Sequence, residues 1–203
     1  CDQTFKVVAN MTVAGLPDAI TFAKGAFAAI ADDLRMQTTG DLIIELVDGE
    51  GGTVARSNPC RFSENAALLP YWGDLHGQSE ETIGTNSARE FYEFARDKAF
   101  LDICVHQGND FQISNEFWQH LNELSAEFTV DDSFIVFPGW EWSGNTGLGG
   151  DRNVLHMTEG RPIHRSSHAL VDDLSDLESD ENSAQGLFRA LDGEDCTVFA
   201  PIG

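Results

Sequence analysis

The chain has 203 residues, of which 34 are acidic and 12 are basic, so its formal net charge is -22. Such an acidic surface repels phosphate backbones, so nucleic-acid binding is not expected, whereas a divalent cation would be attracted. No apolar run approaches the roughly 18 residues that a membrane span needs. We therefore expect a soluble protein, cytoplasmic or periplasmic, that has no membrane partner.

Residues 1–66 are expected to form a small β-rich, sandwich-like domain. The runs 5–9 and 41–47 are strand-like, and Asp48-Gly49-Glu50-Gly51-Gly52 is typical of a hairpin turn that leads into a returning strand at 53–56. The Ala-rich stretch 23–31 is compatible with a helix. No catalytic residue types gather in this segment, so we expect it to have no role in chemistry.

Residues 67–203 are expected to form an α/β domain, because apolar strand-like runs alternate with helix-like ones. Ser87 and Glu90 have the spacing of a capping box at the start of one helix, and Ser114 is a plausible N-cap of the next. The expected strands are 71–75, 101–105, 134–137, 153–157 and 197–200, and the expected helices are 87–97, 114–128 and 184–191. Near-continuous apolar strands in this alternation predict a mainly parallel sheet.

Polar side chains of the kinds that bind metals lie at or next to the ends of four of these strands. Barrel-like α/β folds gather such groups at the C-terminal ends of their strands. The groups are Asp74, His76, Gln78, His106, Asn109, Asp110, Glu141, Asp151 and Arg152. Imidazole with carboxylate suits Zn, Mn or Fe. The alternative is that these groups cap helices and satisfy buried backbone, which fits Asp74 or Asn109 taken singly.

Three segments together resemble the PHP (polymerase and histidinol phosphatase) superfamily. They are Asp74-Leu75-His76, the cluster of His106, Asn109 and Asp110, and Gly139-Trp140-Glu141. The similarity covers about residues 68–203 and is closest to a large PHP-like family of unknown function. That family carries Trp-Gly-Asp-Leu-His and Gly-Gly-(His/Asp)-Arg-Asn-Val segments, and a similar β domain precedes them. The resemblance implies a distorted (β/α)7 barrel with a two- or three-metal site that hydrolyses phosphate esters.

The resemblance also implies roles for single residues. His76 matches the first metal histidine, Glu141 matches the bridging carboxylate, and Asp151 stands where many relatives have a metal histidine. His106, Asn109 and Asp110 occupy a second motif that usually reads Thr-Asp-His. The usual His-x-His of the first motif is His76-Gly77-Gln78 here, and a neutral amide is a weak ligand. One or two metals in an oxygen-rich shell, with Mg or Ca also possible, fit this pattern better than three.

Several residues have two interpretations. Asp74 is either a ligand or an acceptor that orients a histidine. His106 is either a ligand or a satisfied core histidine, and His106 or Asp110 could transfer protons. Arg152 is either a clamp for an anionic substrate or part of an ordinary ion pair. His156 is expected either in the site or in the core. The other three histidines, His120, His164 and His168, are expected at the surface or on a helix face, and the acidic run 171–181 is expected to be solvated or mobile.

The sequence therefore predicts a metal-dependent hydrolase of phosphoesterase type that acts on a small molecule, for which an anionic substrate is one option. One alternative is a degenerate PHP scaffold that binds a metal or a sugar-like ligand without turnover. The other is one segment of a larger assembled protein. A seven-stranded barrel needs more strands than the four or five expected after residue 67. We therefore expect further polypeptide, either a C-terminal continuation or a partner chain, to pack near residues 197–200.

Overall fold

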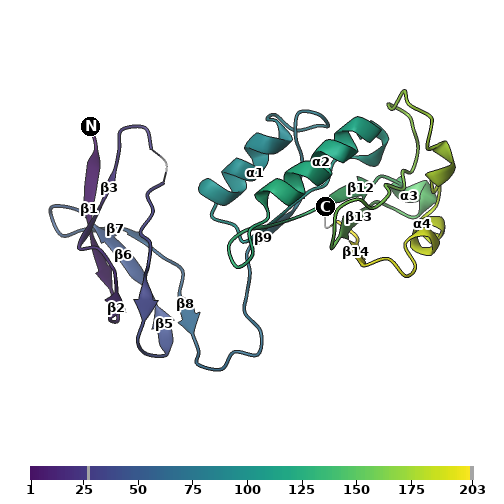
Figure 1. Ribbon diagram of the computed structural model, residues 1–203. Helices are drawn as coiled ribbons and strands as arrows, with labels where there is room; N and C mark the ends of the chain where they lie inside the picture. The colour runs from purple at the N-terminus through teal and green to yellow at the C-terminus, as the bar shows by residue number, and fades with distance from the viewer. Residues whose placement is uncertain (27, 202–203) are drawn as a thin grey trace. The chain divides into compact units, whose positions relative to one another are not determined.

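The computed structural model describes residues 1–26 and 28–201, and the chain divides into two units, Cys1–Pro70 and Tyr71–Gly203. The division falls a few residues after the expected boundary between 66 and 67. None of the helices in the described part of the chain has the length and apolar character that a membrane span requires. Figure 1 shows the elements of each unit.

The first unit is built from antiparallel strands. Its largest sheet has the order β3-β1-β6-β7, and two small two-stranded sheets accompany it. The strands are β1 (Gln3–Ala9), β2 (Val13–Ala14), β3 (Ala19–Phe22), β4 (Arg35–Met36), β5 (Gly40–Leu42), β6 (Ile44–Val47), β7 (Thr53–Arg56) and β8 (Cys60–Phe62). The predicted hairpin joins β6 to β7, and the Asp48 carboxylate fixes its turn by accepting hydrogen bonds from the backbone N–H groups of Glu50 and Gly52. Residues 23–26 and 28–31 are not helical, and Phe27 lies outside the described residues.

The second unit begins with a parallel sheet of order β11-β10-β9. Its strands are β9 (Gly73–Gly77), β10 (Ile103–His106) and β11 (Ile135–Phe137), and helices α1 (Ala88–Asp97) and α2 (Asn115–Phe128) connect them. Figure 1 shows α1 and α2 next to each other beside this sheet. Both helices begin where the sequence indicates, since Ser87 and Glu90 form a complete capping box and the Ser114 hydroxyl accepts from Phe117 N–H. Their apolar faces pack into the core of the unit, together with β10.

A second sheet, of order β12-β13-β14, is antiparallel throughout. It consists of β12 (Gly139–Trp142), β13 (Arg152–His156) and β14 (Cys196–Phe199). The remaining elements are the 3-10 helices η1 (Asp110–Gln112) and η2 (Leu177–Ser179), the single-turn α3 (Asn145–Leu148), and α4 (Ala184–Ala190).

The expectation of a distorted (β/α)7 barrel is wrong. Among the described residues the sheets are small and mostly antiparallel, and no seven-fold β-α alternation is present. Pro138, which has no backbone N–H for a ladder, separates β11 from β12, so the chain leaves the parallel sheet there. The connection 143–151 between β12 and β13 is shorter than the dozen or more residues that a parallel crossover typically needs, so β13 returns antiparallel.

The core of the second unit is aromatic. Trp140 and Trp142 are fully buried, and the rings of Trp118 and Trp140 meet edge to face with centroids 5.4 Å apart. Trp72, by contrast, is 70% exposed just before β9. Aromatic pairs of this kind add to the free energy of burial, so this cluster anchors β12 against α2.

Candidate functional site

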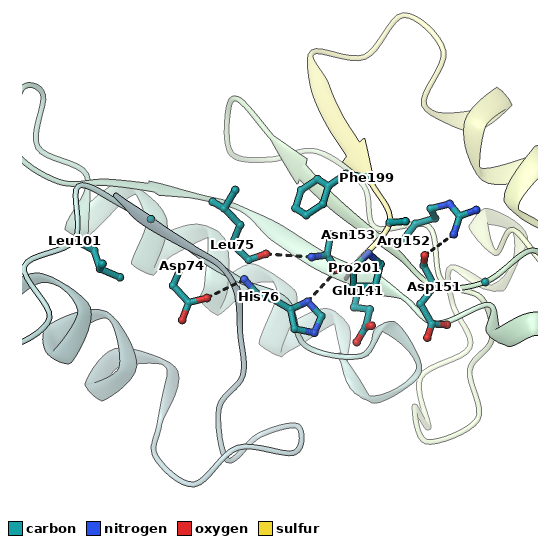
Figure 2. Close-up of a pocket in the computed structure, with 13 residues that line it drawn as sticks. Asp74, Leu75, His76, Leu101, Glu141, Asp151, Arg152, Asn153, Phe199 and Pro201 are labelled. Carbon is teal, nitrogen blue, oxygen red and sulfur yellow. Dashed lines mark hydrogen bonds between the residues drawn. The ribbon is translucent and has the colours of Figure 1, made fainter. Parts of the chain in front are cut away.

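An open pocket of about 1030 Å³ lies in the second unit, and β9, β12, β13 and the segment 199–201 line it (Figure 2). Five of the residues predicted from the sequence line this pocket, namely Asp74, His76, Glu141, Asp151 and Arg152. Its apolar wall is formed by Leu75, Leu101, Phe199, Ala200 and Pro201. The structure therefore brings together the groups predicted at residues 74–76, at Glu141 and at 151–152, but not those at 106–110.

Asn153 fixes the orientation of the His76 ring. The Asn153 side chain is buried, and its Nδ2 donates to the Leu75 carbonyl at 3.1 Å. The amide oxygen therefore faces His76 Nδ1, 3.1 Å away, so Nδ1 carries the proton and donates. This tautomer leaves a lone pair on His76 Nε2. Metal-binding histidines are held in the same way by an acceptor on their other nitrogen.

Glu141 lies beside His76 in a largely buried position. Glu141 is 7% exposed, and its burial raises the pKa of its carboxyl above the usual value. A protonated His76 would act against this rise, whereas the nearby Asp151 adds to it. Asn109 Nδ2 donates to Glu141 Oε2 at 2.7 Å, and the Glu141 backbone N–H donates to the Gly108 carbonyl. The side chain and the backbone of Glu141 are thus both tied to the end of β10.

Gln78 and Asn109 support the site rather than line it. Thr82 Oγ1 donates to Gln78 Oε1 at 2.6 Å, and Gln78 Nε2 donates to the Gln107 carbonyl at 2.8 Å. The amide oxygen of Gln78, the atom that would bind a cation, is therefore already engaged. Asn109 Nδ2 donates to Ser143 Oγ as well as to Glu141 Oε2. Both amides act as positioning groups in this structure.

The other charged residues that line the pocket, Asp74, Asp151 and Arg152, each use part of their side chain in a local hydrogen bond. Asp74 Oδ1 accepts from His76 N–H at 3.0 Å, and Asp151 Oδ1 accepts from Asn145 N–H at 2.9 Å. The Arg152 guanidinium turns back along its own loop and donates to the carbonyls of Asp151 and Gly149. Figure 2 shows this contact of Arg152 with Asp151. Arg152 thus closes the loop before β13.

His106 and Asp110 do not line the pocket. His106 is fully buried, and burial lowers its pKa to about 4. Gly108 N–H donates to His106 Nδ1, so Nε2 carries the proton and donates to Ser79 Oγ at 2.7 Å. Burial raises the pKa of Asp110 to about 6, although hydrogen bonds from Ser166 oppose the rise. The structure gives His106 the environment of a satisfied core histidine.

The donor set fits a divalent cation only in part. His76 offers Nε2 and Glu141 offers Oε1, since neither atom has a hydrogen bond within the described residues. Imidazole nitrogen and carboxylate oxygen suit Zn, Mn and Fe. Within residues 1–26 and 28–201, however, no group of three or more His, Cys, Asp or Glu side chains is arranged to hold a metal. A cation held by two protein ligands would need water or substrate to complete its shell.

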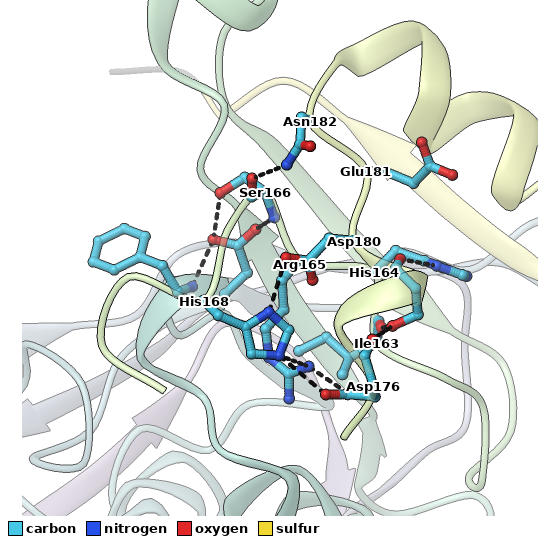
Figure 3. A network of polar contacts seen from close by, with 12 residues as sticks. Ile163, His164, Arg165, Ser166, His168, Asp176, Asp180, Glu181 and Asn182 are labelled. Atoms are coloured by element: carbon cyan, nitrogen blue, oxygen red, sulfur yellow. Dashed lines mark hydrogen bonds and ion pairs between the residues drawn. The ribbon is translucent and has the colours of Figure 1, made fainter. Parts of the chain in front are cut away.

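Figure 3 shows a second polar cluster in the segment 163–182, none of whose residues lines the pocket. Arg165 is fully buried and donates to the Ile113 carbonyl, to Asn115 Oδ1 at 2.7 Å and to Asp176 Oδ2 at 2.6 Å. His168 lies between Asp180, 2.8 Å from Nδ1, and Asp176, 3.0 Å from Nε2. Burial alone would lower the pKa of His168, but these two carboxylates outweigh it and raise the pKa.

The surface placement expected for His168 is therefore wrong, since its side chain is 4% exposed. Two acids of the run 171–181, which was expected to be solvated, are its partners. Asn153 is the residue of the pocket that the sequence did not single out. Asn153 lies inside an apolar strand. The one indication of its position in the sequence is that neighbouring side chains of a strand point to opposite faces of the sheet, so Asn153 and Val154 face opposite sides.

Comparisons with known proteins give relatives but no family. No family model matches the sequence, and no solved structure matches it. An uncharacterised protein of Chlamydia pneumoniae is 30% identical over 132 residues, which cover 64% of this chain and 21% of that protein. An uncharacterised protein of Chlamydia trachomatis serovar D is 26% identical over 151 residues, which cover 73% of this chain and 24% of that protein.

The chain thus spans about a quarter or less of the length of the curated relatives it matches. Because both relatives are themselves uncharacterised, the similarity to the PHP superfamily stays a prediction.

Proposed function

We propose that the pocket is the site of a metal-dependent hydrolase of phosphoesterase type, in which His76 and Glu141 bind a divalent cation. One observation carries this proposal. Asn153 presents the lone pair of His76 Nε2, and Asn109 holds Glu141 so that Oε1 stays free, within one pocket. Zn, Mn or Fe suits this pair of donors, and Mg or Ca would bind with more water in its shell.

A divalent cation in this position supplies polarisation of the scissile bond and lowers the pKa of a bound water. The chain's own residues supply the rest. Asp74 and Asp151 are the lining carboxylates that can accept a proton, because each has one oxygen outside its local hydrogen bond. His106 and Asp110, the proton-transfer groups expected from the sequence, do not line the pocket, which makes the two lining carboxylates the better candidates.

The charge of the pocket makes the proposed hydrolysis dependent on metal. Three carboxylates line the pocket, and the one guanidinium among its lining residues is held by backbone carbonyls. A small-molecule substrate with an anionic ester would be repelled by this surface unless a cation offset the carboxylates. The wall formed by Leu75, Leu101 and Phe199 would contact an apolar part of such a substrate.

Calorimetric titration with Mn²⁺ and Zn²⁺ tests the proposal. We expect His76→Ala and Glu141→Gln each to weaken binding by at least about tenfold, since each removes one of the two protein ligands. His120→Gln, a change at an exposed histidine outside this pocket, is the matched control and should bind as the wild type does. Hydrolysis of aryl phosphate esters should need the metal and fall with the same variants. Metal binding that both variants leave unchanged would disprove the site.

A second candidate function is metal or ligand binding without turnover. The observation that favours it is the absence of a third ionisable ligand among the described residues, together with the engaged amide oxygen of Gln78. Metal binding that His76→Ala abolishes, with no hydrolysis of phosphate mono- or diesters, would select this candidate. In either case, further polypeptide, as a continuation or as a partner chain, is part of the proposal.

A further inference from the structure

Two of the strands at the ends of the sheets in the second unit, β9 and β14, border the pocket. The sheet orders β11-β10-β9 and β12-β13-β14 place β9 and β14 at the ends of their sheets. Gly73 to His76 of β9, and Phe199 with the two residues that follow it, line the pocket. The pocket is therefore open along two strand edges.

The hydrogen-bond ladder shows which groups of β14 face outward. Met157 N–H donates to the Asp195 carbonyl, and the antiparallel register pairs Leu155 with Thr197. Because hydrogen-bonded pairs alternate along an antiparallel ladder, the N–H and C=O groups of Thr197 point to β13, whereas those of Val198 point to the open side. Neither backbone group of Val198 has a hydrogen bond within the described residues.

Strand β9 also has backbone groups that point away from its partner strand, β10. Ile103 N–H donates to the Trp72 carbonyl, so Trp72 and Asp74 face β10, and Gly73 and Leu75 face away. The Leu75 carbonyl accepts from Asn153 Nδ2. Within the described residues the Leu75 N–H and both backbone groups of Gly73 remain without a partner.

Strand β14 lacks the features with which proteins protect free strands, whereas β9 carries Asp74 and pairs with β10 through a register shift. Cys196-Thr197-Val198-Phe199 contains no charged residue, no proline and no register shift. Charged side chains, proline and bulges are the usual means of blocking an edge. Strand β9 is parallel yet largely exposed, whereas β10 beside it is largely buried, and parallel sheets are normally covered on all sides. Tyr71 and Trp72, just before β9, are 65% and 70% exposed.

We propose that extended strands of further polypeptide, belonging to a longer protein of which this chain forms part, pair with the β9 and β14 edges and wall the pocket. This inference rests on the proposed function only for the location of the pocket. The evidence for strand pairing is the set of unpaired backbone groups, which does not depend on a metal. The length of the relatives supports this occupant, because this chain spans only 21% and 24% of them. A second copy of this chain would bring the same three pocket carboxylates, and the same net charge of -22, against each other, which is unfavourable.

Amide hydrogen exchange tests this inference on two samples, the 203-residue chain and the natural gene product purified under native conditions. In the chain alone, the Thr197 and Phe199 amides, which face β13, should exchange at least about 100-fold more slowly than the Val198 amide. In the natural gene product, the Val198 and Leu75 amides should also slow by at least about 100-fold. A Val198 amide that exchanges equally fast in both samples would overturn the inference.

A pair of proline variants gives an independent test. Val198→Pro removes an outward N–H, leaves the ladder hydrogen bonds to β13 in place and trims a side chain that packs against the core. It should leave the Mn²⁺ affinity of the chain alone unchanged, and it should lower the unfolding temperature of the natural gene product more than that of the chain alone. Thr197→Pro removes a ladder N–H, so it should destabilise both samples. Light scattering that shows the chain alone as a dimer, which Val198→Pro dissociates, would overturn the inference in favour of a second copy. Since Mn²⁺ affinity is read separately, a failure of the edge pairing and a failure of the metal site are distinguishable.

Discussion

Replacing Asn153 tests whether the orientation of His76 creates the metal site. Asn153→Ala removes the acceptor of His76 Nδ1 and the donor to the Leu75 carbonyl, at contacts of 3.1 Å each. The ring would then be free to turn and to change tautomer. Loss of such a supporting contact typically costs about 10- to 100-fold in metal affinity. That corresponds to about 1.4–2.7 kcal/mol.

Two measurements report on this prediction. Titration with Mn²⁺ should show the loss of affinity for Asn153→Ala, and ¹⁵N chemical shifts of the imidazole should show His76 protonated on Nδ1 in the wild type but mixed in the variant. Asn153→Asp is the matched control, because it keeps an acceptor for His76 Nδ1 while it removes the donor to Leu75. Its Mn²⁺ affinity should equal or exceed that of the wild type.

Suppose that Asn153→Ala binds Mn²⁺ as tightly as the wild type, whereas His76→Ala binds it more weakly. The role of Asn153 in orienting His76 for metal binding would then be refuted. Such a result would show that His76 binds metal without needing its acceptor. A wild-type His76 protonated on Nε2 in the metal-free protein would refute it as well.

Three further predictions concern stability. Arg165→Ala should cost about 3–5 kcal/mol of the free energy of unfolding in urea, because the buried guanidinium loses its hydrogen bonds to Ile113, Asn115 and Asp176 together. Arg89→Ala, which breaks the exposed pair with Glu127, should cost no more than about 1 kcal/mol. The pKa of His168 is raised in the folded state, so its contribution is complete below about pH 6.5 and is lost as the pH rises through the folded-state pKa. The wild-type Tm should therefore fall more steeply above this pH than that of His168→Gln, and equal slopes would contradict the assignment. Gly150 has a φ of 81°, so Gly150→Ala should cost about 1–2 kcal/mol, whereas Gly49→Ala, with open space around it, should be nearly neutral.

Local elements were the part of the fold that the sequence predicted well. The capping box of Ser87 and Glu90 and the N-cap at Ser114 place two helix starts correctly, because a cap depends on residues only three positions apart. The hairpin at Asp48 follows from turn chemistry of the same short range.

Strand pairing could not be predicted in the same way, because it joins residues far apart in the chain. The strand expected at 134–137 forms as β11, yet a further strand that was not expected, β12, follows Pro138 and pairs antiparallel with β13. An apolar strand has the same composition in a parallel and in an antiparallel sheet when both faces are buried, as in β12. The length of the connection 143–151 was the one available signal against a parallel crossover.

Polar groups at strand ends allowed part of the candidate site to be predicted from the sequence. His76 and Glu141 do share a pocket, whereas His106, the last residue of β10, lies in the core against Phe91 and Phe117. Which side of a strand end faces the pocket depends on the twist and register of the sheet. The register shift between β9 and β10 at His106 is a feature of that kind.

The distribution of tryptophan has a consequence for spectroscopy of this protein. All four tryptophans belong to the second unit, three of them packed in its core and Trp72 open to solvent. Intrinsic fluorescence should therefore combine a blue-shifted and a red-shifted emission, both from residues 71–203. Unfolding of the β-rich first unit produces no direct fluorescence signal and has to be followed by circular dichroism. A difference between the two midpoints would give the separate stabilities of the units from one unlabelled sample.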